Sequence, residues 1–166
     1  MIRSINKVMA PAMRGIRLMV GRGVLALVND AAKMQTVQVK LLDGEVRDME
    51  RFQNYGFTSY PQVGAEVAAV FVGGNRDHGL VLAIDDRRFR LKALQAGEVA
   101  LYDDQGAVIK LSRTGIVING GGHAINISGA AQVNVTGGDV IADGISLKTH
   151  KHGGVTAGGA QTGIPV

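Results

Sequence analysis

Two histidines separated by a single lysine, His150 and His152, lie in the segment SLKTHKHGGV at residues 146–155. In an extended strand, side chains two residues apart point to the same face, about 7 Å apart along the chain. Two imidazoles from one chain make a poor metal site, but three chains around one axis would supply six nitrogen donors. Six such donors suit octahedral iron(II), cobalt or nickel better than zinc, which prefers four ligands. The alternative is a pair of exposed histidines without a function.

The segment before these histidines, residues 98–147, repeats a short pattern of two apolar residues two positions apart followed by a glycine or asparagine turn. Most steps are about eight to ten residues long, and regular short strands of this kind predict a repeating β structure. The apolar pairs are Val99/Leu101, Ile109/Leu111, Ile116/Ile118, Ile125/Ile127, Val133/Val135 and Ile145/Leu147, with Val140/Ile141 between the last two.

Such strands cannot bury themselves. Each offers two or three aliphatic side chains on one face, and aromatic residues make up only 4% of the chain, with no tryptophan. This is too little apolar surface for a stable monomeric core. We therefore expect three copies to intertwine as a homotrimeric β-prism or triple-stranded β-helix over residues 97–147. Residues 148–166 would form the apex, with a glycine-rich end that covers the metal site or, alternatively, is a flexible tail.

Residues 22–96 have a different pattern, with about five β-rich runs separated by polar turns, one of them at Asp43-Gly44. A small antiparallel barrel of the oligonucleotide/oligosaccharide-binding (OB) type fits this spacing, and a small sandwich is the alternative. The OB fold does not by itself imply nucleic-acid binding. We expect an all-β protein with this barrel in its N-terminal half.

Residues 1–21 carry apolar residues at helical spacing, and we expect an amphipathic docking helix that Pro11 kinks or interrupts. Burial of this helix in the chain's own core is the alternative. Its basic residues could contact nucleic acid or anionic lipid, but a solvated or partner-docked face is favoured, and no nucleic-acid partner is expected. The basic residues of positions 1–22, which contain no acid, are Arg3, Lys7, Arg14, Arg17 and Arg22.

Several functional classes are disfavoured by the sequence. There is no cysteine, so disulfides and thiolate metal sites are excluded. No apolar run approaches a membrane span of about 18 residues, and we expect no signal peptide. The carboxylate pairs Asp85-Asp86 and Asp103-Asp104 consist of adjacent residues, which face opposite ways in strands, so we interpret them as turns or solvated edges. His78 and His123 lack a serine or cysteine partner in a recognisable motif. We therefore expect no enzyme.

Two longer segments, SYPQVGAEVAAVFVGGNRDHGLVLA (59–83) and THKHGGVTAGGAQTG (149–163), resemble the baseplate assembly protein V family. These proteins are the central tail spikes of Mu-like and P2-like contractile phages and of R-type bacteriocins. The resemblance implies a homotrimer in the virion, at the tip of the tail baseplate, whose N-terminal region and OB domain bind the tail tube and the baseplate hub.

The resemblance also implies a triple-stranded β-helix with an iron ion at its apex, bound by His150 and His152 of three chains. Sheath contraction would drive this spike through the host outer membrane. Some Mu-like spikes bind calcium and chloride on the axis, and Asp139 or Asp143 are candidate calcium ligands. The alternative function is a trimeric tail-fibre-like module that recognises surface carbohydrate. That function favours exposed aromatics along the shaft, where residues 98–166 contain only Tyr102.

Overall fold

The computed structural model describes residues 2–152, 154, 158 and 159 of the chain. They divide into two compact units, Met1–His123 and Ala124–Val166. Helix α1 spans Ile2–Leu18, and two short 3-10 turns, η1 and η2, span Leu42–Gly44 and Val72–Gly74. The strands of the first unit are β1 (Val20–Asn29), β2 (Thr36–Lys40), β3 (Val46–Arg51), β4 (Glu66–Phe71), β5 (Gly79–Asp85), β6 (Val99–Tyr102), β7 (Ala107–Leu111) and β8 (Ile116–Gly120). The second unit has β9 (Ile141–Ala142) and β10 (Ile145–Ser146).

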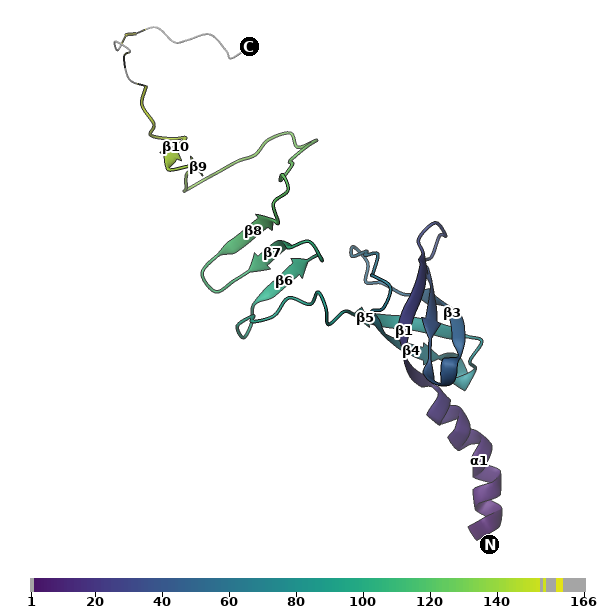
Figure 1. The fold of residues 1–166 in the computed structure, drawn as a ribbon. Helices are drawn as coiled ribbons and strands as arrows, with labels where there is room; N and C mark the ends of the chain where they lie inside the picture. Colours follow the sequence, from purple (N-terminus) through teal and green to yellow (C-terminus); the bar gives the residue numbers. More distant parts are fainter. Residues whose placement is uncertain (1, 153, 155–157, 160–166) are drawn as a thin grey trace. The chain divides into compact units, whose positions relative to one another are not determined.

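Strands β1 to β5 form a closed barrel in the order β1-β2-β3-β5-β4 (Figure 1). The long strand β1 pairs antiparallel with both β2 and β4, so it belongs to both halves of the barrel. Strands β3 and β5 close the barrel through a short parallel pairing. This five-stranded closed arrangement fits the OB fold. The predicted barrel is confirmed, and the sandwich alternative is wrong.

The barrel interior is filled by side chains from alternating strand positions, as a pleated strand with one buried face requires. Val37 and Val39 on β2, and Val67 and Phe71 on β4, are almost fully buried. Gly23 allows β1 to approach β2 closely, because a Cβ atom there would lie 2.5 Å from Val39 Cγ1. The complete core is Leu25, Val28, Val37, Val39, Leu41, Met49, Ala65, Val67, Ala69, Phe71 and Val81.

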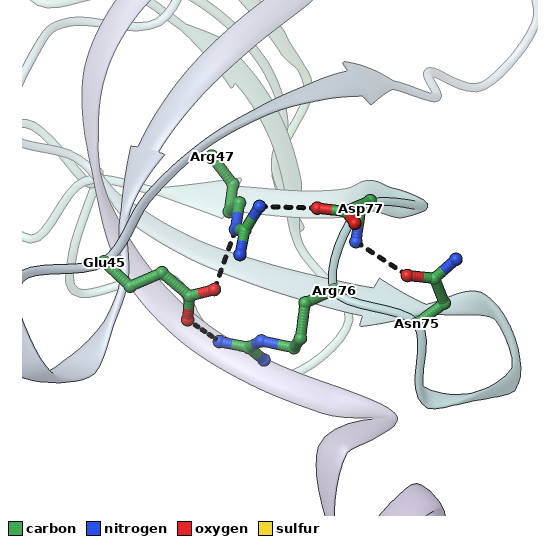
Figure 2. A network of polar contacts seen from close by, with 5 residues as sticks. All are labelled: Glu45, Arg47, Asn75, Arg76 and Asp77. Atoms are coloured by element: carbon green, nitrogen blue, oxygen red, sulfur yellow. Dashed lines mark hydrogen bonds and ion pairs between the residues drawn. The ribbon is translucent and has the colours of Figure 1, made fainter.

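One end of the barrel is stabilised by a network of ion pairs between the start of β3 and the loop that precedes β5 (Figure 2). Glu45, just before β3, accepts from Arg47 Nε at 2.7 Å and from Arg76 Nη2 at 2.5 Å. Arg47 also pairs with Asp77 at 2.5 Å. Hydrogen bonds from Arg76 and then Arg47 lower the pKa of Glu45 to about 2. Arg76 in addition lies over the ring of Phe71, 4.0 Å from its centroid, so the network continues into the core.

Helix α1 runs unbroken through Pro11, so of the two effects expected of this proline the interruption is wrong, and the kink stays a prediction. A proline removes one backbone donor, and the remaining hydrogen bonds carry the helix past it. The helix ends at Leu18, and β1 starts at Val20. The sequence predicted a helix over residues 1–21, which extends three residues further at its C-terminal end. Its apolar side chains, Val8, Met9, Met13 and Ile16, are exposed, so within the chain the helix is not part of the core. This helix lacks the length and apolar character needed to cross a membrane, and the described residues contain no other candidate.

Strands β6, β7 and β8 form an antiparallel meander that corresponds to the first three strands of the expected repeat. Here each strand takes its backbone partner from its own chain, whereas intertwining predicts partners from neighbouring chains. In the second unit, the apolar pairs at 125–127 and 133–135 are not in strands. Among the residues of this unit that the structure describes, only β9 and β10 pair, as a two-stranded hairpin.

Candidate metal site and apolar shaft surface

The β9–β10 hairpin positions the segment that carries the two histidines. Its two-residue turn is Asp143-Gly144, and both residues have positive φ, +48° and +82°. Such a turn matches the right-handed twist of the flanking strands, and Asp-Gly is one of the sequences that favour it. After β10 the chain turns again, and the backbone N–H of His150 donates to Ser146 O at 3.1 Å. The histidines therefore follow directly from a short, tightly closed hairpin.

The ring of His150 is held in place by contacts of its Nδ1 atom with two backbone carbonyl oxygens. Its Nδ1 lies 2.9 Å from Ser146 O and 3.1 Å from Leu147 O. Carbonyl oxygens only accept hydrogen bonds, so Nδ1 must carry the proton and donate. The lone pair of the neutral ring is then on Nε2, where it is available for a metal ion. This arrangement, with one ring nitrogen bonded to a backbone carbonyl and the other ligating, is usual for metal-binding histidines.

His152 lies beside His150, with the ring centroids 5.0 Å apart and the planes at 79°. Both side chains are exposed. The structure brings the two predicted ligands together, although residues 147–152 form a turn and an irregular segment instead of the expected strand. Among the described residues, no group of three or more histidine, cysteine or acidic side chains could hold a metal. One chain thus offers two imidazoles, and a complete shell needs donors from elsewhere.

The other histidines and the acidic pairs belong to the first unit, whereas His150 and His152 belong to the second. His78 and His123 are in turns of the first unit. Asp103 Oδ1 accepts from the backbone N–H groups of Gln105 and Ala107, and so closes the β6–β7 turn. Asp86 binds the guanidinium and the backbone N–H of Arg88, as in a local turn. The carboxylates of Asp86 and Asp103 are thus engaged in turn contacts, as interpreted from the sequence, whereas Asp104 accepts from Gln62 Nε2 at 3.0 Å.

The β6–β8 meander presents an apolar face that no described residue of the first unit covers. Register pairs Leu101 with Ile109 and Ile109 with Ile118, and directly opposed residues share a face of the sheet. Side chains of this face are between 46% and 72% exposed. We call it the shaft face, and it consists of Val99, Leu101, Ile109, Leu111, Ile116 and Ile118.

A second exposed surface was not found from the sequence. The β3–β4 connection, residues 52–65, carries Phe52, Tyr55, Phe57 and Tyr60, and each is 47% exposed or more. Arg51 fixes this loop by donating to Ser59 O and Ser59 Oγ at 2.7 and 2.8 Å. The signal was available in the sequence, since four of the chain's seven Phe and Tyr residues lie within residues 52–60. The barrel core is complete without them.

Comparison with known proteins identifies two regions of the chain. Residues 22–88 match the family model described as Bacteriophage Mu Gp45, N-terminal, and residues 144–166 match the GpV Apex motif. The first match covers the barrel, and the second includes both His150 and His152. These matches confirm the resemblance predicted from residues 59–83 and 149–163.

Two curated relatives give the same result. The chain is 42% identical over 113 residues to "Baseplate puncturing device gp45" of Escherichia phage Mu, covering 68% of this chain and 57% of that protein. It is 42% identical over 118 residues to "Mu-like prophage FluMu protein gp45" of Haemophilus influenzae, covering 70% of this chain and 64% of that protein. The chain therefore spans less than two thirds of the length of either relative.

Proposed function

We propose that this chain, a relative of the phage Mu gp45 proteins with a GpV apex motif, is a structural spike of a contractile-tail baseplate that punctures the bacterial outer membrane. The printed name of the Mu relative, a baseplate puncturing device, supports this function and a location in the tail baseplate. The spike acts mechanically, driven by contraction of the sheath, and needs no catalytic centre. Its N-terminal helix and barrel would bind the tube and hub of the baseplate.

The observation that carries the proposal is the uncovered shaft face. Six aliphatic side chains on one face of a three-stranded sheet stay about half exposed or more. Contiguous apolar surface of this kind marks an interaction site. Three copies winding around one axis would bury the face of each chain against the other two, as a homotrimer. A narrow shaft with a shared core resists bending and fraying under axial load.

The residues at the apex fit the metal that the family implies. His150 has Nδ1 committed to carbonyl oxygens and Nε2 free, and His152 lies beside it with an exposed ring. Two histidines from each of three chains would hold one iron ion in an octahedral shell. When bound, this ion cross-links the three chains and supplies no open position for substrate. His150 and His152 thus serve to tie the chains at their narrow end.

The test is sedimentation of the full chain combined with elemental analysis. We expect a trimer with about one transition-metal ion per three chains, because six imidazoles complete one octahedral shell. The double variant His150→Ala/His152→Ala should lose the metal and stay trimeric. His123→Ala, a histidine of the first unit, is the matched control and should keep the metal. A monomeric wild-type chain contradicts the spike, and a metal-free trimer contradicts the clamp.

Carbohydrate recognition is the second candidate, and one observation favours it. The aromatic loop, residues 52–60, borders a groove of about 700 Å³ lined by Phe52, Phe57 and Tyr102. Exposed aromatic rings next to amide and hydroxyl groups suit stacking on neutral sugars. Most of this surface lies on the barrel, and the shaft contributes only its start at β6 through Leu101 and Tyr102, whereas a tail-fibre module would carry such a surface along the shaft. Calorimetry with host surface oligosaccharide decides the matter: binding that Phe57→Ala removes supports recognition, and no binding contradicts it.

A further inference from the structure

Asp139 spans the β9–β10 hairpin with a single carboxylate. Its Oδ1 accepts from the backbone N–H of Val140 at 2.8 Å and from that of Lys148 at 3.1 Å. Its Oδ2 accepts from the hydroxyl of Ser146. Asp139 precedes β9 and Lys148 follows β10, so the carboxylate connects the entry of the hairpin to its exit. The side chain therefore fixes the point at which the chain leaves for the histidines.

Ser146 connects Asp139 by hydrogen bonds to the turn that carries His150. Its Oγ donates to Asp139 and accepts from the backbone N–H and the hydroxyl of Thr149 at 2.8 and 2.7 Å. A serine hydroxyl has one donor and two acceptor positions, and all are used here. The carbonyl oxygen of the same residue accepts from the backbone N–H and from Nδ1 of His150. Ser146 is thus bonded to Asp139 on one side and to His150 on the other.

The charge of Asp139 strengthens these contacts, because hydrogen bonds to an ionised carboxylate are roughly twice as strong as neutral ones. The hydrogen bond from Ser146, followed by those from Lys148 and Val140, holds the pKa of Asp139 below its ordinary value. Three of about four acceptor positions on the carboxylate already face N–H or O–H groups. A cation bound there would meet these hydrogens, so the side chain is better suited to hold the turn than to ligate calcium.

We propose that Asp139 is a positioning residue for the apex metal site: through Ser146 it fixes the 146–150 turn, which keeps the proton of His150 on Nδ1 and presents Nε2 to the metal. This inference rests on the proposed function, since it concerns the same two histidines. Outer hydrogen bonds that orient a histidine ligand typically affect metal affinity about 10- to 100-fold. The carbonyl oxygen of Ser146 accepts directly from His150, whereas Asp139 would act on His150 through Ser146 and is one hydrogen bond further from the metal.

The variants Asp139→Asn and Asp143→Asn form a matched pair that tests the positioning role of Asp139. Both remove one negative charge from the same hairpin, and asparagine tolerates the positive φ of residue 143. Asp143 takes no part in the hydrogen bonds from Asp139 to His150. Ser146→Ala is a second test variant, which removes the connecting hydroxyl without a change of charge. All are made in the full chain, and sedimentation checks that each is trimeric.

Two readouts are measured. Competition with a chelator gives the affinity for Fe(II) or Co(II), and ¹⁵N NMR of the metal-free chain reports which ring nitrogen of His150 carries the proton. We expect Asp139→Asn and Ser146→Ala to weaken metal binding about 10-fold or more and to move His150 away from the Nδ1–H tautomer. Asp143→Asn should stay within about twofold of the wild type, because a remote exposed charge has a small effect.

The outcomes separate the two proposals. Equal affinities and the same tautomer in Asp139→Asn and Asp143→Asn overturn the positioning role. A changed tautomer with unchanged affinity also overturns it, since the turn would then not matter to the metal. If wild-type trimers bind neither metal, the clamp of the proposed function fails. The tautomer readout, which needs neither metal nor trimer, still decides whether Asp139 positions the ring.

Discussion

The barrel and the shaft strands are both built from short β strands rich in aliphatic residues, yet only the barrel buries them. Val39 and Val81 in the barrel are completely buried, whereas the most covered side chain of the shaft face, Ile109, is 46% exposed. Among the described residues, none after Val81 is buried. The barrel closes on itself through the β3–β5 pairing, whereas the described residues of the first unit form no second layer on the three-stranded meander. Closure, more than composition, decides which region is stable alone.

The largest effect is expected from a charge in the shaft face. Ile118→Asp places a carboxylate in a surface that the trimer would bury, and an unpaired buried charge costs several kcal/mol in each chain. We expect sedimentation to give a monomer, while circular dichroism retains the barrel. Asn119→Asp, the next residue on β8 and on the other face, should leave the trimer intact. If Ile118→Asp stays trimeric, the shaft face is not the interface.

A cavity in the barrel core should lower the free energy of unfolding whether or not the chain is part of a trimer. Phe71 is 2% exposed, and Phe71→Ala is expected to lower the free energy of unfolding by about 3–5 kcal/mol. Urea denaturation in the Ile118→Asp background measures this in a chain expected to be monomeric. In the same background Leu101→Ala, at a position 54% exposed, should cost less than about 1 kcal/mol. Comparable losses would mean that the shaft strands have a core of their own.

The attachment of α1 to the barrel offers a smaller test. Gly74 in η2 has φ of +75°, and a Cβ atom there would lie 2.5 Å from Gly15 O in the helix. Gly74→Ala should destabilise this junction by about 1–3 kcal/mol. Gly73→Ala has a similar φ but nothing within 4 Å, so it isolates the backbone cost alone. Amide hydrogen exchange in α1 should be faster in Gly74→Ala than in Gly73→Ala. Equal exchange rates in the two variants would contradict a tight junction between α1 and η2.

The smallest effect concerns acid. The folded-state pKa of Glu45 is about 2, below its ordinary 4.5, because Arg76 and Arg47 bind the carboxylate. Its contribution to stability is therefore fully present above about pH 4.5 and is lost as the pH falls through 2. Unfolding free energies measured over this window should fall less steeply in Glu45→Gln. Glu50→Gln, on β3 outside the network, should keep the wild-type slope, and an unchanged slope in Glu45→Gln would exclude this role.

The barrel could be predicted from the sequence because its signals are local. Apolar residues alternate in 36–41 and 66–71, and turns such as Asp43-Gly44 separate the strands. The spacing of Leu101, Ile109 and Ile118 likewise predicted short strands that carry too few apolar side chains to form a core of their own. At Pro11 the sequence left a kink or an interruption open, and the helix is not interrupted, since a single lost hydrogen bond is outweighed by those around it. Which strands pair depends on contacts far apart in sequence, and the pattern alone did not determine it.

The apex was only partly accessible from its residues. Spacing identified His150 and His152, and the rings lie 5.0 Å apart. The roles of Asp139 and Ser146 were not predicted, because their contacts depend on how the hairpin folds back. The Asp143-Gly144 pair was a usable signal for that hairpin. The expected covering of the metal end by the glycine-rich segment falls largely on 153, 155–157 and 160–166, outside the described residues.

The meander β6–β8 also has a kinetic consequence. Strands β6 and β8 form its two edges, and unpaired edges next to bare aliphatic residues readily template aggregation. On the proposed assembly, each newly made chain carries this hazard until it meets two others, so spike yield should depend steeply on expression level. The barrel has a buried core of its own, so we expect the hazard in an unassembled chain to be confined to the shaft strands.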